Sequence, residues 1–238
     1  MGDRGKIEAA KLAVEEFRDA VLDAGIIGIG TGSTVSRVID VFADEGVFKG
    51  KTVVSSSIDT VIKLSSKGIH AVHPSSVAVV DIYFDGADEV DPFGNMIKGR
   101  GAALYGEKML AYKSLINVFI VDESKTVTKL GSSKPVPLEV NRWMLGTIEI
   151  LLDKMGYRYE YRKGGKDGPV ISDFGGVVLD VYTGPIEDPF SIEEKLLYVP
   201  GIVETGLFLG YTDYIVVGWD KGGGEVRRYS RSRGVSYS

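Results

Sequence analysis

The chain has 238 residues, of which 44% are hydrophobic, so it can bury a sizeable core in one large domain or in a large and a small one. A formal net charge of −5 argues against a nucleic-acid partner, and the lack of cysteine excludes a disulfide framework and thiolate chemistry. No apolar signal segment opens the sequence and no run approaches the ~18 apolar residues of a membrane span, so we expect a cytoplasmic protein without a membrane partner.

Helical and strand patterns alternate through the first half of the chain. Apolar residues recur at helical spacing from Lys6 to about Leu22, which predicts an amphipathic helix. The elements expected after it are a strand over 24–30, a helix opened by 31–34, a strand over 52–54, a helix from 58 that ends at Gly68, strands over 69–72 and 77–84, a helix from 101 and a strand over 117–122. This alternation predicts a parallel, Rossmann-like α/β sheet flanked by helices.

The sequence changes character after Leu130. Residues 131–137 are rich in glycine, serine and proline, which is typical of a linker. The elements expected beyond it are a helix over 143–155, strands near 157–161, 170–172 and 177–182, a helix near 189–197 and strands near 202–209 and 214–219. We therefore expect a Rossmann-like domain of residues 1–130 and 210–238, with a smaller α+β domain of residues 131–209. The basic end of the chain, from Arg227 on, is expected to be a frayed tail.

The turn between the first strand and the second helix, Gly30-Thr31-Gly32-Ser33-Thr34, suits an anion. Glycine lets the backbone come close, the first helical N–H groups point at the ligand, and Thr31, Ser33 and Thr34 add hydroxyl donors. The alternative is that Ser33 or Thr34 only caps the helix. A dinucleotide fingerprint needs glycine at position 33 and an acid after the next strand, and a P-loop needs Gly-Lys-Ser/Thr, so a compact phosphate ester fits better.

Acids and a lysine gather after the buried strand at 77–84. Four carboxylates fall within seven residues, namely Asp85, Asp88, Glu89 and Asp91. Lys98 follows in a glycine-rich turn, and Glu107 lies in the second turn of the next helix, where partial desolvation makes a carboxylate a better proton acceptor. Open α/β sheets bind ligands at the carboxyl ends of their strands, where Lys125 also falls. The alternatives are a solvated acidic turn, a surface Glu–Lys pair at Glu107 and a solvated Lys125.

Metal binding is the weaker interpretation of these acids. The segment 85–88 lacks the alternating ligands of a calcium loop, although a looser Mg²⁺ site at Asp85 and Asp88 stays open. The two histidines, His70 and His73, face opposite ways on an extended segment, so neither a shared metal nor a Ser-His-Asp triad is expected. We expect no metal and no cofactor. The residues instead suit proton transfer next to a carbonyl, with a glutamate base, a lysine for the oxyanion and a phosphate anchor.

Several segments of the sequence, taken in order, resemble ribose-5-phosphate isomerase of the A type. They are GIGTGST, DGADE, KG-x-GAAL-x-x-EK, E-Y-R and LDV, and the likeness runs over nearly the whole chain. The resemblance implies that a small-molecule sugar phosphate, D-ribose 5-phosphate, is interconverted with D-ribulose 5-phosphate through an enediolate, in the non-oxidative pentose phosphate pathway. It also implies that no metal or cofactor takes part. With it we expect a homodimer or homotetramer.

The resemblance also implies roles for individual residues. Glu107 matches the base, while Asp85, Asp88 and Lys98 match the residues that assist ring opening and stabilise the intermediate. The substrate-binding positions are Thr31, Gly32, Ser33, Thr34, Gly86, Ala87, Gly99, Arg100, Gly101 and Lys125. The family's lysine turn is usually KGGG, so Arg100 is a departure, and its backbone must avoid a glycine-only conformation. Its side chain either faces solvent or contacts the substrate.

Two other functions stay open at this point. One is a related amino-sugar phosphate isomerase/deaminase, which shares the phosphate turn. The other is a non-catalytic sugar-phosphate sensor. Such modules are usually attached to a DNA-binding helix-turn-helix, and we expect none before Lys6.

Overall fold

A computed structural model describes residues 3–165 and 167–235, which form two compact units. The first unit comprises residues 3–87, 106–126 and 210–235, and the second comprises Asp88–Tyr105 and Val127–Leu209. This division differs from the expected one in segments 88–105 and 127–130. The physical reason is strand pairing, because β5 (Glu89–Val90) and β6 (Met96–Ile97) form a small sheet with β12 (Leu207–Phe208) of the second unit.

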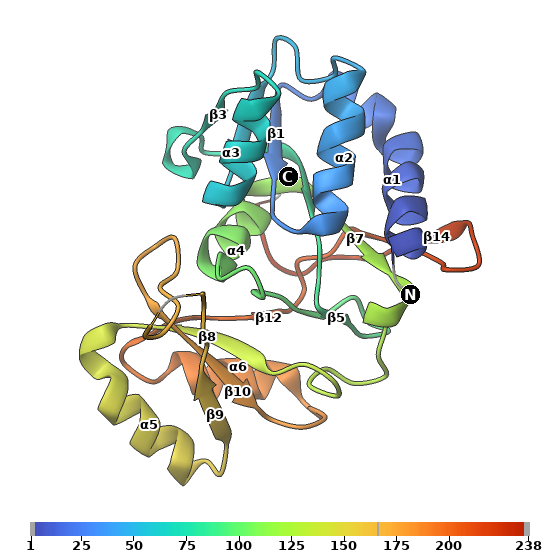
Figure 1. Cartoon of the computed structure of the whole chain (residues 1–238). Coiled ribbons are helices and arrows are strands. Elements are labelled where there is room, and N and C mark those ends of the chain that lie inside the picture. Colours follow the sequence, from blue (N-terminus) through green and yellow to red (C-terminus); the bar gives the residue numbers. More distant parts are fainter. Residues whose placement is uncertain (1–2, 166, 236–238) are drawn as a thin grey trace. The chain divides into compact units, whose positions relative to one another are not determined.

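The first unit is built on a seven-stranded sheet in the order β14-β13-β7-β4-β1-β2-β3 (Figure 1). Its strands are β1 (Ile26–Ile29), β2 (Thr52–Ser55), β3 (Ala71–Val72), β4 (Val80–Asp85), β7 (Ser114–Asp122), β13 (Tyr214–Gly218) and β14 (Gly224–Arg228). All neighbours run parallel except β13 and β14. The Rossmann-like sheet and the return of residues 214–219 to it are thus confirmed.

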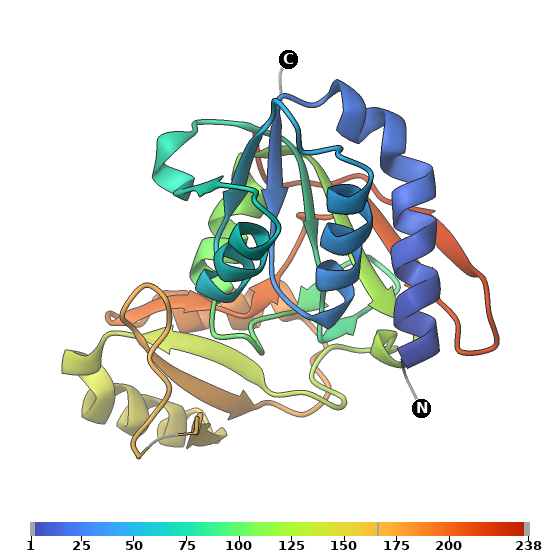
Figure 2. The same ribbon diagram turned by 45° about the horizontal axis from the view of Figure 1, so that its top comes forward.

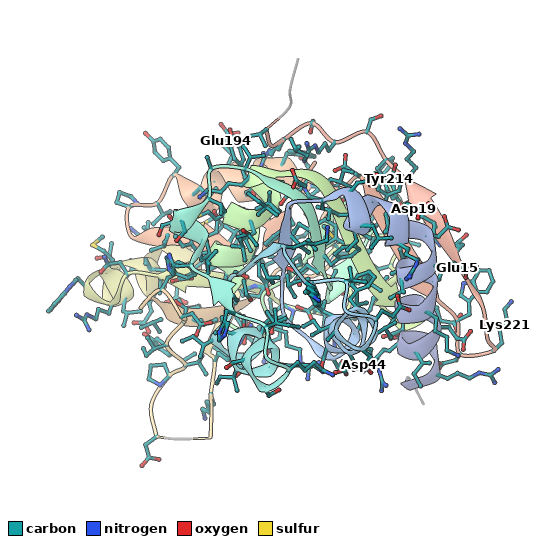
Figure 3. The ribbon with its side chains drawn as sticks, turned by 90° about the horizontal axis from the view of Figure 1, so that it is seen from above. Glu15, Asp19, Asp44, Glu194, Tyr214 and Lys221 are labelled. Carbon is teal, nitrogen blue, oxygen red and sulfur yellow. The ribbon has the colours of Figure 1, made fainter. Side chains whose placement is uncertain are left out.

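Helices surround this sheet. They are α1 (Asp3–Asp23), α2 (Ser33–Asp44), α3 (Ile58–Ser66) and α4 (Leu104–Lys113), with short 3-10 turns at Pro74–Ser76 and Glu123–Lys125. α1 and α2 lie side by side (Figure 2), and Phe17 and Phe42 from them meet Phe84 of β4 edge to face. Burial of each such ring contributes roughly 1.5–3 kcal/mol. The opposite sides of the two helices carry exposed acids, among them Glu15, Asp19 and Asp44 (Figure 3).

The second unit contains a four-stranded antiparallel sheet in the order β11-β8-β10-β9 and the three-stranded sheet β12-β6-β5. The larger sheet is made of β8 (Val136–Val140), β9 (Arg158–Tyr161), β10 (Val177–Tyr182) and β11 (Ile202–Thr205). Its helices are α5 (Leu145–Lys154) and α6 (Pro189–Leu197), and a 3-10 turn covers Arg142–Met144. Buried aliphatic side chains of β8 and β10 form its core together with Ile148 and Leu196.

Three expectations about elements are wrong. The linker at 131–137 contains the start of β8, whose five residues are all buried. In place of a strand at 170–172 the structure has isolated bridges, such as Ile171 with Val177. The tail from Arg227 is ordered as far as described: β14 pairs with β13, and the Val235 N–H donates to the Tyr112 carbonyl. Residues 236–238 of the tail lie outside the described residues. No helix in the described ranges is long and apolar enough to cross a membrane.

Candidate active site

Asp85 is the last residue of β4, and its carboxylate is held by three donors. Oδ1 accepts the N–H groups of Thr31 at 3.1 Å and of Gly86 at 2.7 Å, and Oδ2 accepts the hydroxyl of Tyr83. The side chain is fully buried. A Cβ on Gly30 would lie 2.1 Å from the Asp85 Cγ, so only glycine fits beside this carboxylate. The position and orientation of Asp85 are therefore fixed by its neighbours.

The glycines of the first strand serve these side chains. Gly28 pairs with Tyr83 across the sheet, and a Cβ there would come within 2.9 Å of the Tyr83 ring. Gly28 and Gly30 thus make room for Tyr83 and Asp85 of β4. Only Gly32 of this turn has a positive φ, with φ 117° and ψ 166°, a conformation almost confined to glycine.

The turn 31–34 leads directly into α2 and leaves its N-terminus uncapped. Gly32 is the N-cap, and no side chain of the described residues caps the helix, so the alternative that Ser33 or Thr34 is the cap is wrong. The first intrahelical bond runs from the Ser36 N–H to the Gly32 carbonyl. The first N–H groups of a helix without a side-chain cap, together with the helix dipole, are suited to an anion. Gly32 and Ser33 are exposed, Thr31 is half-buried and Thr34 is buried.

Glu107 lies in the first turn of α4, one turn earlier in its helix than expected, and is 2% exposed. Its charge acts on the same phenol that bonds Asp85. Burial raises the pKa of Tyr83 well above its ordinary value, and the negative charges of Asp85 and Glu107 raise it further. The Tyr83 hydroxyl therefore stays protonated at neutral pH. Two buried carboxylates and one neutral phenol form a cluster in the first unit.

The lysine turn belongs to the second unit. Lys98 is 3% exposed, and its ammonium lies 5.2 Å from the centroid of the Phe208 ring. The Arg100 N–H donates to Asp88 Oδ2 at 3.1 Å, which brings two of the expected site residues together. Among the described non-glycine residues only Ala102 has a positive φ, so Arg100 avoids a glycine-only backbone conformation, as expected. The Arg100 side chain is exposed.

Sequence reasoning assigned no role to Arg162, which fixes this turn from the other side. Its Nη1 donates to the carbonyls of Gly99 and Arg100, and its Nε donates to Asp180 Oδ2 at 2.9 Å. Its Nη2 bonds the second oxygen of Asp180. Arg162 and Asp180 lie in the E-Y-R and LDV segments. The sequence therefore marked both residues as parts of motifs but did not show that they contact each other or the lysine turn.

The remaining expected residues lie directly after β4, in the lysine turn and in the 3-10 turn that follows β7. Gly86 and Ala87 follow Asp85 and are half-buried, Gly99 is buried with φ 105°, and Gly101 is exposed. Lys125 is half-buried in the 3-10 turn after β7, which the Asp122 carboxylate caps. His73 caps another 3-10 turn, at Pro74–Ser76. Across residues 3–165 and 167–235, no group of three or more histidine or acidic side chains is arranged to hold a metal ion.

Known proteins resemble this chain in sequence and in structure. A family model described as ribose 5-phosphate isomerase A (phosphoriboisomerase A) matches residues 52–222. A ribose-5-phosphate isomerase A of Aeropyrum pernix is 43% identical over 230 residues, which cover 96% of this chain and 97% of the relative. A relative of the same name from Thermococcus kodakarensis is 38% identical over 228 residues, or 94% of this chain and 98% of its own.

Two solved structures extend the similarity to the fold. A D-ribose-5-phosphate isomerase in complex with phospho-erythronic acid matches with a TM-score of 0.89 at 34% identity, over 96% of this chain and 99% of that one. The ribose 5-phosphate isomerase of Plasmodium falciparum matches with a TM-score of 0.86 at 33% identity, over the same shares of the two chains.

Proposed function

The chain belongs to the ribose 5-phosphate isomerase A family, and from that premise we propose how its own residues interconvert D-ribose 5-phosphate and D-ribulose 5-phosphate. The reaction is an aldose–ketose isomerisation. It moves one hydrogen from C2 to C1 and one hydroxyl proton from O2 to O1. No atom is gained or lost and no oxidant is consumed, so the protein has to supply a base, a stabiliser for the charge that develops on oxygen, and a grip on the phosphate.

Glu107 is the base of this reaction. In the open-chain aldehyde it removes the C2 proton, and the electron pair of the broken C–H bond forms the C1=C2 bond of an enediolate. The negative charge then develops on O1. Return of the proton to C1, with transfer of the O2 proton to O1, gives the ketose. Burial of Glu107 supports this role, because a desolvated carboxylate is a stronger proton acceptor than a hydrated one.

Lys98, Asp85 and Asp88 assist ring opening and stabilise the intermediate. We assign to the buried Lys98 ammonium the stabilisation of the developing oxyanion, because a positive charge that is shielded from water acts strongly. Asp85 accepts a hydrogen bond from a substrate hydroxyl and so orients the reacting carbons. Asp88 keeps the lysine turn in place through the Arg100 N–H. We assign substrate contacts to the backbone groups of Gly86, Ala87, Gly99, Arg100 and Gly101.

The phosphate binds at the N-terminus of α2. The N–H groups and hydroxyls of residues 31–34 surround it, and Lys125 meets it as a point charge. The observation that carries the proposal is the geometry of the first unit. There the uncapped helix N-terminus follows directly from Thr31, whose N–H bonds Asp85, and Asp85 and Glu107 act on the same buried phenol.

An assay of ketose formation from ribose 5-phosphate tests the function. We expect full activity after treatment with EDTA, because every assigned role is filled by a side chain or a backbone group. Unphosphorylated ribose is expected to be a very poor substrate. Release of ammonia from an amino-sugar phosphate, without conversion of ribose 5-phosphate, would instead assign the chain to the deaminase alternative. Activity that is lost with EDTA and restored by Mg²⁺ would make Asp85 and Asp88 metal ligands.

The assembly is a further part of the proposal. The expected homodimer or homotetramer is supported by large apolar side chains at the surface, among them Trp143 and Tyr198, which are 82% and 88% exposed. Light scattering on the purified protein gives the molar mass, and a monomer would contradict this expectation.

A further inference from the structure

Tyr83 is a buried polar residue that the roles above do not use. It is 0% exposed and lies in β4, two residues before Asp85, so both side chains emerge on the same face of the sheet. Its hydroxyl donates to Asp85 Oδ2, and the charge of Glu107 also acts on it. Gly28 provides the space for its ring, since any Cβ there would come within 2.9 Å of the ring. The phenol therefore fits at this position only because β1 has a glycine opposite it.

We propose that Tyr83 is a positioning residue for the isomerisation: its hydroxyl holds the Asp85 carboxylate as a fixed hydrogen-bond acceptor, so that Glu107 alone takes up the proton of the substrate. The inference rests on the proposed function and deepens it. Tyr83 is not among the expected site residues. The inference says that this residue makes Asp85 a hydrogen-bond acceptor and leaves Glu107 as the base.

The hydrogen-bond inventory supports this assignment. A carboxylate that is ionised accepts only, whereas a protonated acid brings a donor of its own. Asp85 faces three donors, the N–H groups of Thr31 and Gly86 and the hydroxyl of Tyr83. A proton on Oδ2 would displace the hydrogen bond that the Tyr83 hydroxyl donates there, in a fully buried place where an unmade hydrogen bond is costly.

The phenol can fill this role because it keeps its own proton. Its pKa is raised well above the ordinary value, first by burial and then by the charges of Asp85 and Glu107. The nearby Ser56 hydroxyl has a smaller, opposite effect on this pKa. Tyr83 thus remains a donor at neutral pH. Without it, two buried carboxylates close to one site would compete for the transferred proton.

Tyr83→Phe tests the inference, because phenylalanine keeps the ring and removes only the hydroxyl. We expect Tm within a few degrees of the wild type, KM within about twofold, and kcat lower by about 10- to 100-fold, the effect of losing one hydrogen bond to a charged group. The matched control is Tyr214→Phe in β13 of the same sheet, where the ring packs edge to face on Phe17. Its kcat is expected to equal that of the wild type.

The contrary results are distinct from one another. If Tyr83→Phe keeps kcat within twofold of the wild type, or loses more than about 10 °C in Tm, Tyr83 is a core residue and the inference is overturned. If the wild type itself does not convert ribose 5-phosphate, the proposed function is wrong. The inference about Tyr83 then falls with it, before any variant is compared.

Discussion

Lys98 is a buried lysine of the candidate site. It is 3% exposed, with its ammonium over the Phe208 ring. Desolvation of an ammonium costs free energy, so a positive charge at this depth acts strongly on any negative charge that develops near it. Lys98 follows β6 and precedes the two carbonyls that Arg162 bonds, so the backbone from which its side chain extends is fixed on both sides.

We predict that Lys98→Ala lowers kcat by about 10² to 10³, like the loss of an oxyanion donor. The charge on O1 develops only in the transition state, so KM is expected to change much less. Steady-state kinetics with ribose 5-phosphate measure both constants. If KM rises and kcat is unchanged, Lys98 binds the substrate and does not stabilise the enediolate.

The glycines of the first strand show where reasoning on single residues fell short. The pattern predicted that they let the backbone approach an anion, and Gly32 has the backbone conformation that such a turn uses. Gly28 and Gly30, by contrast, make room for Tyr83 and Asp85, about 55 positions further along the chain. A periodic pattern within one strand carries no information on which side chain the partner strand will place opposite each glycine.

The lysine turn is an element fixed from two sides within the second unit. Asp88 accepts the Arg100 N–H, and Arg162 donates to the carbonyls of Gly99 and Arg100 while it pairs with Asp180. Neither charged partner is more than 17% exposed at its side chain, so this ion pair is shielded from solvent. The forked guanidinium can bond a carboxylate and two carbonyls at once, which a lysine ammonium cannot do with the same geometry.

Arg162→Lys is therefore expected to lower kcat by about tenfold, because the turn that carries Lys98 loses two of its fixed contacts. The matched control is Arg158→Lys at the start of β9, the strand that ends one residue before Arg162; the Arg158 side chain is 67% exposed, and the substitution should leave kcat unchanged. Kinetics of both variants, with circular dichroism to verify folding, make the comparison. Equal kcat values for the two variants would mean that Arg162 does not position the lysine turn.

The sequence predicted the elements with a strong period best. Residues 189–197 form α6, where a helix was expected, and the apolar stripe from Lys6 to Leu22 lies within α1. The segment 131–137 misled because Gly131, Pro135 and Pro137 favour a loop, while β8 gains its stability from pairing with strands β10 and β11. The strand β14 was missed because arginines and glycines obscure its pattern, although charged residues on an edge strand protect it from further pairing.

The same limits apply to the site. The sequence placed Asp85 next to the end of a strand, as found, but it placed Glu107 one helical turn too late and did not predict the burial of Asp85 and Lys98. It could not supply Tyr83 or Arg162, because their partners are defined by side-chain packing and not by spacing in the chain. Tyr83 had no signal beyond an aromatic residue in a strand, and Arg162 had only the E-Y-R motif, which does not say which residues it contacts.

A buried acid outside the candidate site, Glu139 in β8, makes the stability of the chain depend on pH. It is 1% exposed and accepts the Ser172 hydroxyl, and no partner for its Oε2 is present among the described residues. Burial raises the pKa of Glu139 above its ordinary value of 4.5, and the charges of Glu204 and Asp173 raise it further. The folded protein therefore holds this proton more tightly than the unfolded chain does.

Its contribution to stability is complete below pH 4.5 and is lost as the pH rises through the folded-state pKa. Glu139→Gln, which stays neutral, is predicted to raise the free energy of unfolding at pH 8 by about 1 kcal/mol and to flatten the decline above pH 4.5. Urea unfolding at several pH values measures this. The control Glu160→Gln, at a side chain that is 58% exposed, should follow the wild type. Parallel curves for Glu139→Gln and the wild type would contradict the prediction.

The most direct test of the whole account concerns the proton that Glu107 carries. Glu107→Gln keeps the size of the side chain but cannot accept a proton, so it is expected to fold normally and to bind ribose 5-phosphate with nearly unchanged affinity. Proton NMR of the substrate in deuterated water follows loss of the C2 hydrogen and appearance of the ketose together. The account predicts that the variant loses at least ~10² in kcat and shows no C2 exchange. Exchange at the wild-type rate would place the base elsewhere, at Asp85 or Asp88, and would contradict the account.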